Sequence, residues 1–244
     1  MNSSVKAVIL AAGEGSRLMP FTSYQPKCLV TLGKKNLLQY QIDSLHSIGI
    51  RDITVITGYK SEKIEYKEIK KIYNPDFNIT NMVASLMCAG NILTEGNDIL
   101  VAYSDIVYEP RILESLFRCS EPLSTTVDLN WLKLWRVRGD DPLLDAESLK
   151  MDSNGNIVEL GKKVENLDAI EAQYMGLIKF RAEISSKLPR IYNNLSKNDL
   201  YDSKNRQNMY MTSFLQYLID IGYILRAVPI SGGWLEVDTA NDLE

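Results

Sequence analysis

The segment from residue 8 to residue 30, VILAAGEGSRLMPFTSYQPKCLV, constrains the fold of this chain more than any other. It begins with the aliphatic run Val8-Ile9-Leu10, which is typical of a parallel strand buried on both faces. The run leads into a turn from Ala11 to Ser16, where small residues let backbone N–H groups approach a ligand closely. A strand that ends in such a turn indicates an α/β fold with a phosphate-binding loop.

Two common phosphate-binding motifs do not fit this turn. A dinucleotide fingerprint requires a third glycine where this chain has Leu18, and a P-loop requires a Gly-Lys-Ser/Thr sequence that the turn lacks. What remains is Gly-x-Gly-x-Arg, ending at Arg17, followed by Pro20 and then by Pro26-Lys27. Arginine offers a rigid fork for phosphate oxygens, and lysine offers a mobile point charge. The segment therefore predicts a phosphate site to which a loop delivers two cations.

Strand and helix patterns alternate through the first half of the chain. We predict strands near 5–11, 53–57 and 99–103, and helices near 36–48, from about 61, near 80–93 and from 110. This order is typical of a parallel sheet covered on both faces, which binds ligands at the carboxyl ends of its strands. Gly13, Gly58 and Asp105 follow three of these strands.

The second half departs from this order. Asn154-Gly155 is a hairpin turn signal and predicts a hairpin over 149–160. Further strands are expected over 172–180 and 224–230, with a helix around 214–219 between them. We therefore predict an α/β fold with a single domain over 1–244, whose mixed, mostly parallel central sheet carries helices on both faces.

Composition excludes several classes of protein. The chain has 244 residues and 45% hydrophobic content, enough for one large domain with a substantial core. No stretch approaches the roughly 18 apolar residues of a membrane span, and Met1 to Lys6 has no signal-like pattern, so we expect no membrane association and a cytoplasmic location. The net charge of −4 argues against a nucleic-acid partner. The only histidine, His46, lies on the flank of a predicted helix, so the chemistry must do without a histidine base.

Two acidic residues from distant parts of the sequence are placed to share one site. Asp105 follows the strand 99–103, and Asp238 lies in a short acidic cluster after the strand 224–230. Mg²⁺ binds through one or two carboxylates together with water and substrate phosphates. Each acid taken alone could equally cap a helix or form a turn.

The N-terminal segment resembles the signature of the nucleotidyltransferases, which join a nucleoside triphosphate to a sugar phosphate, phosphocholine or a similar phosphorylated alcohol. Their signature reads L-A-A-G-x-G-x-R, then Pro, then Pro-Lys, and each element is present here between Leu10 and Lys27. The resemblance implies a Rossmann-like nucleotidyltransferase fold, catalytic roles for Arg17 and Lys27, and Mg²⁺ held by Asp105 and Asp238. It also implies a nucleotide-binding role for the turn, that is, for Leu10, Ala11, Ala12, Gly13, Glu14, Gly15 and Ser16.

The implied reaction is in-line attack by a phosphate oxygen of the acceptor on the α-phosphorus of the triphosphate, with pyrophosphate as the leaving group. Such transfers depend on positioning and charge neutralisation, so the lack of a catalytic histidine is no obstacle. Asn81 to Leu86 follows Tyr73-Asn74-Pro75 at the place where small cytidylyltransferases carry an Asn-rich, Ser-Leu segment beside the base. This likeness implies that Asn81 and Ser85 read the cytosine of CTP, although Asn81 could instead only cap a helix.

Several segments of the second half resemble one subgroup, the cytidylyltransferases that activate phosphoglutamine for capsular phosphoramidate synthesis. These segments are 131–135, 145–150, 159–163, 171–174, 208–212 and 232–236. The resemblance implies a nucleotide-binding half over about 1–120 and an acceptor-binding elaboration over about 121–244. It implies acceptor-binding roles for Lys162, Glu171, Tyr174, Tyr210 and Trp234. Core packing is the alternative for the aromatic residues, and an acceptor with an ammonium group could use an aromatic face and a carboxylate together.

Other functions stay open. A sugar-1-phosphate nucleotidyltransferase using UTP or dTTP, or a phosphocholine or aminophosphonate cytidylyltransferase, would share the mechanism and differ in the acceptor. A nucleotide-dependent glycosyltransferase typically carries an Asp-x-Asp motif, whereas this chain has Ser104-Asp105-Ile106 and would leave Lys27 unexplained. A non-catalytic nucleotide-binding regulator is disfavoured because Arg17, Lys27, Asp105 and Asp238 occur together.

Overall fold

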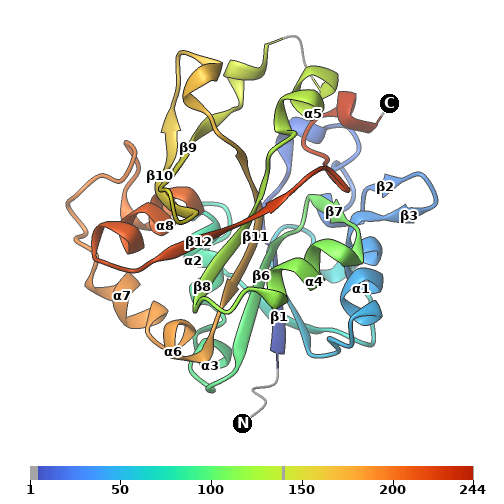
Figure 1. Cartoon of the computed structure of the whole chain (residues 1–244). Helices are drawn as coiled ribbons and strands as arrows, with labels where there is room; N and C mark the ends of the chain where they lie inside the picture. Colours follow the sequence, from blue (N-terminus) through green and yellow to red (C-terminus); the bar gives the residue numbers. More distant parts are fainter. Residues whose placement is uncertain (1–4, 139–140, 244) are drawn as a thin grey trace.

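The first strand, β1 (Val5–Ala11), lies in the middle of the protein with both of its faces covered, as Figure 1 shows for the computed structural model. The structure describes residues 5–138 and 141–243. Val8 and Leu10 pack into a core on one face of the sheet, and Ala7 and Ile9 pack into a second core on the other. Burial on both faces accounts for the uninterrupted apolar run in the sequence, since a strand with one face in solvent would alternate.

β1 belongs to a large mixed sheet. In spatial order its strands are β5 (Lys70–Tyr73), β4 (Ile53–Thr57), β1, β6 (Asp98–Tyr103), β11 (Gln173–Phe180), β8 (Leu123–Asp128), β12 (Leu225–Ile230), β10 (Asn156–Lys163) and β9 (Glu147–Met151). The first four run parallel, and β12 is parallel to β8. β11 is antiparallel to β6 and β8, and β10 is antiparallel to β12 and β9. This confirms the mixed α/β sheet predicted from the sequence.

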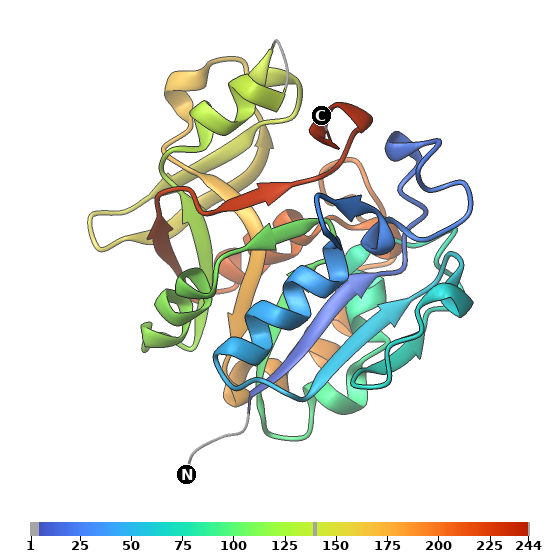
Figure 2. The same ribbon diagram turned by 90° about the vertical axis from the view of Figure 1, so that its right-hand side faces the viewer.

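Helices cover both faces of this sheet, which confirms the predicted layers (Figures 1 and 2). One face carries α1 (Leu37–Ser47), α4 (Pro110–Arg118) and α5 (Trp131–Arg138). The other carries α2 (Met82–Met87), α3 (Gly90–Leu93), α6 (Ala182–Ser185), α7 (Leu188–Asn194) and α8 (Met211–Asp220). Within the described ranges, none of these helices is long and apolar enough to cross a membrane.

A small two-stranded sheet brings the C-terminal segment to the end of β6. β7 (Ile106–Tyr108) pairs antiparallel with β13 (Trp234–Glu236), and the two lie side by side in Figure 2. The backbone N–H of Val237 donates to the carbonyl oxygen of Asp105 at 2.9 Å. This pairing places Asp238 beside Asp105, although 133 positions separate them in the sequence. A second small sheet joins β2 (Thr31–Leu32) to β3 (Lys35–Asn36) ahead of α1.

Two helix predictions need correction. The charged helix expected from about residue 61 is wrong: only the single 3-10 turn Ser61–Lys63 forms, and Lys70–Tyr73 becomes the edge strand β5. The exposed edge of β4 offers backbone hydrogen bonds to this segment, and that pairing overrides local helix propensity. The helix expected over 80–93 is divided into α2 and α3, which meet just before Gly90, a poor residue for a helix interior.

Candidate active site

The turn after β1 forms one wall of a cavity of about 300 Å³, which we call the loop cavity. It lies at the carboxyl ends of β1 and β6. Its lining contains most of the residues predicted to bind nucleotide or metal, namely Leu10, Ala12, Gly13, Gly15, Ser16, Arg17, Lys27, Asn81, Ser85, Asp105 and Asp238. The other two turn residues are not in the lining, because Ala11 is buried in the core and Glu14 is exposed.

Gly15 allows the turn to pack directly on Lys27. Its φ of +66° lies in the left-handed region, and a Cβ there would come 2.9 Å from the Cβ of Lys27. The hydroxyl of Thr22 donates to the carbonyl oxygen of Gly15 at 3.0 Å and fixes the turn from the other side. The glycine in the signature is thus required both by the backbone conformation and by the close approach of lysine.

Lys27 lies between the two predicted metal ligands. Its side chain is 10% exposed, and Nζ lies 2.7 Å from Oδ2 of Asp105 and 2.6 Å from Oδ1 of Asp238. Burial alone would lower the pKa of Lys27, but the charges of Asp105 and Asp238 outweigh it and raise that pKa above its usual value. The lysine therefore stays cationic throughout the physiological range.

The two carboxylates also fit a divalent cation. Oδ1 of Asp105 is buried and has no hydrogen-bond partner among the described residues. An orphaned carboxylate oxygen is costly unless a ligand satisfies it, and Mg²⁺ requires few protein ligands when substrate phosphates complete its shell. No group of three or more His, Cys, Asp or Glu side chains able to hold a metal ion occurs in the described part of the chain.

The position of Asp238 is set by a network behind it. Oδ2 of Asp242 accepts hydrogen bonds from the backbone N–H groups of Asp238 and Thr239, each at 2.8 Å. Arg138 holds Asp242 at 2.9 Å and Glu236 at 2.6 Å. Asp242, and not Asp238, therefore caps the C-terminal turn. The side chain of Asp238 is left to contact Lys27 and also the guanidinium of Arg17, which lies 2.5 Å away.

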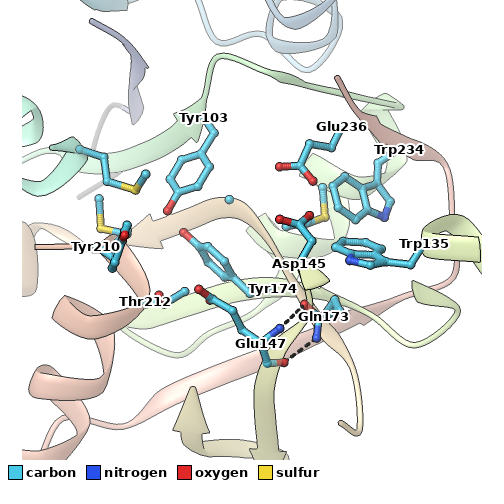
Figure 3. A pocket seen from close by; sticks show the side chains of 14 residues that line it. Tyr103, Trp135, Asp145, Glu147, Gln173, Tyr174, Tyr210, Thr212, Trp234 and Glu236 are labelled. Carbon is cyan, nitrogen blue, oxygen red and sulfur yellow. Dashed lines mark hydrogen bonds between the residues drawn. The ribbon is translucent and has the colours of Figure 1, made fainter. Parts of the chain in front are cut away.

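A second cavity, of about 150 Å³, adjoins the first and shares Met82 and Tyr103 with it (Figure 3). We call it the acidic cavity because three carboxylates line it, from Asp145, Glu147 and Glu236. Its remaining side chains are largely aromatic or neutral polar, including Trp135, Gln173, Tyr174, Tyr210, Thr212 and Trp234.

Three of the five predicted acceptor residues line this cavity: Tyr174, Tyr210 and Trp234. Trp234 is 5% exposed, and its Nε1 donates to the buried carboxylate of Asp128 at 2.8 Å, so it is also a core residue.

The structure does not bring Lys162 and Glu171 to either of these two cavities. The side chain of Lys162 is 59% exposed and pairs with Glu159 at 2.8 Å, and Glu171 is exposed and accepts from the N–H of Met151 at 3.0 Å.

Sequence reasoning missed the individual acids of the second cavity, although it singled out the segments that contain them. Burial raises the pKa of Glu147 to about 7, opposed by a hydrogen bond with Thr212 and assisted by the charges of Asp145 and Asp202. Burial and the charge of Asp105 raise the pKa of Glu236, although Arg138 acts in the opposite direction. The available signal was the two-residue period of a strand, which puts Glu147 on the same face of β9 as the buried Leu149.

Asn81 and Ser85 line the loop cavity and already have hydrogen-bond partners. Oδ1 of Asn81 accepts from the N–H of Met82 at 2.8 Å, which makes it the N-cap of α2. Oγ of Ser85 accepts from Nδ2 of Asn74 at 3.0 Å. The capping role considered for Asn81 is therefore present, and the amide and hydroxyl still border the cavity.

Known proteins similar to this chain identify its family. The model of the MobA-like NTP transferase domain matches residues 7–130. A CTP:phosphoglutamine cytidylyltransferase of Campylobacter jejuni is 44% identical to this chain over 249 aligned residues, which cover 98% of each protein.

Two solved structures share the fold. A CTP:phosphocholine cytidylyltransferase from Streptococcus pneumoniae superposes with a TM-score of 0.70 at 21% identity, covering 98% of this chain and 96% of that one. The inositol-1-phosphate CTP transferase from T. maritima gives a TM-score of 0.74 at 20% identity, covering 100% and 93%. The chain therefore belongs to the MobA-like NTP transferase family and is a nucleotidyltransferase.

Proposed function

We propose that this enzyme transfers the cytidylyl group of CTP to phosphoglutamine and releases pyrophosphate. The 44% identity to a CTP:phosphoglutamine cytidylyltransferase over nearly the whole chain supports both substrates. The observation that carries the proposal is the junction of the two cavities at Tyr103, beside the lysine and carboxylate cluster. A triphosphate in one cavity and an acceptor in the other would meet there.

In this proposal the loop cavity holds the triphosphate. Backbone N–H groups of the turn and the fork of Arg17 bind its phosphate oxygens, and Lys27 contacts the α-phosphate and the incoming acceptor phosphate. Mg²⁺ on Asp105 and Asp238 would neutralise phosphate charge when bound. Because Lys27 stays cationic, it stabilises the charge that develops during in-line transfer without any proton transfer.

We further propose that Asn81 and Ser85 read the cytosine base. Both border the loop cavity, Asn81 as the N-cap of α2 and Ser85 within that helix. An amide and a hydroxyl together offer the donors and acceptors that distinguish cytosine from uracil.

A cytoplasmic location and a division of the chain near residue 120 stay predictions.

A second candidate is a phosphocholine or aminophosphonate acceptor. The three carboxylates of the acidic cavity favour it, since such acceptors carry a cationic nitrogen without a carboxylate. A sugar 1-phosphate has no cation for these acids to meet and is therefore the weaker alternative.

The test is a pyrophosphate-release assay with Mg²⁺ that crosses CTP, UTP, dTTP and ATP with phosphoglutamine, phosphocholine, 2-aminoethylphosphonate and glucose 1-phosphate. We expect CTP with phosphoglutamine to give the highest kcat/KM. Preference for UTP or dTTP with glucose 1-phosphate would overturn the proposal, and preference for another amine acceptor with CTP would favour the second candidate.

A further inference from the structure

The acidic cavity contains one carboxylate that no cation neutralises. Asp145 and Glu236 both pair with Arg138, at 3.7 Å and 2.6 Å. Glu147 has no ion pair with any described residue, and none of the residues that line the cavity is a lysine, arginine or histidine. A carboxylate in such a place is costly unless a ligand supplies the missing cation.

The position of Glu147 is held by its backbone. Nε2 of Gln173 donates to the carbonyl oxygen of Glu147 at 2.6 Å, and the N–H of Glu147 donates back to Oε1 of Gln173 at 3.4 Å. Figure 3 shows these two bonds, with the carboxylate on the side of the cavity where Tyr174 and Thr212 lie. The backbone at Glu147 is thus fixed, and its carboxylate shares a hydrogen bond with Thr212, an arrangement typical of a site built before its ligand binds.

Two tyrosines form the wall between Glu147 and the loop cavity. The rings of Tyr103 and Tyr174 meet edge to face, with centroids 5.8 Å apart. Gly176 makes this arrangement possible, because a Cβ there would come within 2.6 Å of the Tyr103 ring. Aromatic rings beside a carboxylate favour an organic ammonium over a metal ion, since the rings attract the cation and shield it from water.

We propose that Glu147 binds the ammonium group of the acceptor and so makes the enzyme select phosphorylated amines. The inference rests on the proposed function, because it assigns the acidic cavity to the acceptor. Each end of the acceptor then meets a side chain of opposite charge. Its phosphate lies toward Lys27, and its ammonium lies at Glu147. The raised pKa of Glu147 supports this assignment, since it reports a carboxylate whose charge lacks a partner in the free enzyme.

The experiment compares two acceptors in the wild-type enzyme and in Glu147→Gln. One acceptor is phosphoglutamine, and the other is its analogue that lacks only the α-amino group. We expect the wild type to favour phosphoglutamine by about 100-fold in kcat/KM, and Glu147→Gln to reduce that preference to below about 10-fold. The KM for CTP and the kcat/KM for the analogue should change little. Glu165→Gln, at an exposed turn, is the matched control.

Calorimetry separates this inference from the proposed function. If the wild type releases no pyrophosphate yet binds phosphoglutamine more tightly than the analogue, and Glu147→Gln abolishes the difference, the function fails and the inference stands. If pyrophosphate is released equally from both acceptors, or Glu147→Gln weakens both equally, Glu147 has only a structural role. If the wild type neither releases pyrophosphate nor binds phosphoglutamine more tightly than the analogue, both the proposed function and the inference are wrong.

Discussion

The two cavities of this nucleotidyltransferase are built in different ways. The groups that we propose to bind phosphate in the loop cavity come from one short segment, Leu10 to Lys27, in which backbone N–H groups and two cations follow one strand. The acidic cavity is lined by elements that lie far apart in the sequence, including α5, β9, β11, α8 and β13. Charge also differs, since the loop cavity balances two cations against two acids while the acidic cavity has three acids and no cation of its own.

This difference explains why a common reaction step and a variable acceptor can coexist in one fold. A triphosphate presents the same oxygens whatever the acceptor, so a backbone turn with fixed spacing is suited to bind it. An acceptor is recognised by side chains that can change one at a time without disturbing the turn. Changes in the loop cavity should therefore reduce turnover with every acceptor, and changes in the acidic cavity should alter the choice among acceptors.

The largest effect is expected from Lys27→Ala. Loss of the cation at the reacting phosphates should reduce kcat by about 10³-fold with every acceptor. Pyrophosphate release measures the effect, thermal unfolding confirms that the protein is folded, and Lys63→Ala in an exposed turn is the control. A folded Lys27→Ala enzyme that retains its activity would remove Lys27 from the chemistry.

Asp105→Asn tests the metal site in the same cavity. It removes the charge of a carboxylate whose Oδ2 contacts Lys27 and whose Oδ1 has no hydrogen-bond partner among the described residues. We expect the Mg²⁺ concentration needed for half-maximal rate to rise by about 10- to 100-fold. A Mg²⁺ titration of the rate measures this, with the exposed Asp168→Asn as control. An unchanged Mg²⁺ dependence would show that the metal binds elsewhere.

The sequence predicts the loop cavity better than the acidic cavity, because the two are built differently. The spacing from Leu10 to Lys27 is local, so it indicates the loop cavity before any tertiary contact is known. Lys162 was assigned to the acceptor side by resemblance, but a shift of register between Leu160 and Lys163 breaks the two-residue alternation of β10 there. Glu147 was missed because an acid in a strand is ordinarily exposed, and only the packing of β9 beside β11 encloses it.

The pH dependence of stability should single out the acidic cavity. The folded-state pKa of Glu147, about 7, lies above its ordinary value of 4.5, so the native state binds this proton more tightly than the unfolded state does. The contribution of Glu147 to the stability of the folded protein is therefore largest below about pH 4.5 and is lost as the pH rises through 7. The groups facing Glu147 are Asp145, Asp202, Tyr103 and Tyr174, none of them cationic.

Glu147→Gln should consequently unfold at a higher urea concentration than the wild type at pH 8, with a free energy of unfolding larger by about 1 to 3 kcal/mol. At pH 5 the two proteins should be nearly equal. Urea unfolding at both pH values measures the effect. A difference of the same size at pH 5 and pH 8 would mean that the substitution acts through packing and not through charge.

The smallest effects are expected from Lys162→Ala and Glu171→Gln. Both side chains are exposed, and the pair between Lys162 and Glu159 lies on the surface of β10, where an ion pair contributes little. Each variant should change kcat/KM for phosphoglutamine by less than about twofold, because neither residue lines the loop cavity or the acidic cavity. A tenfold rise in the acceptor KM of Lys162→Ala, with an unchanged KM for CTP, would mean that Lys162 leaves Glu159 when the acceptor binds. The acidic cavity would then contain a cation for the α-carboxylate of phosphoglutamine, and its contrast with the loop cavity would be smaller than the free protein indicates.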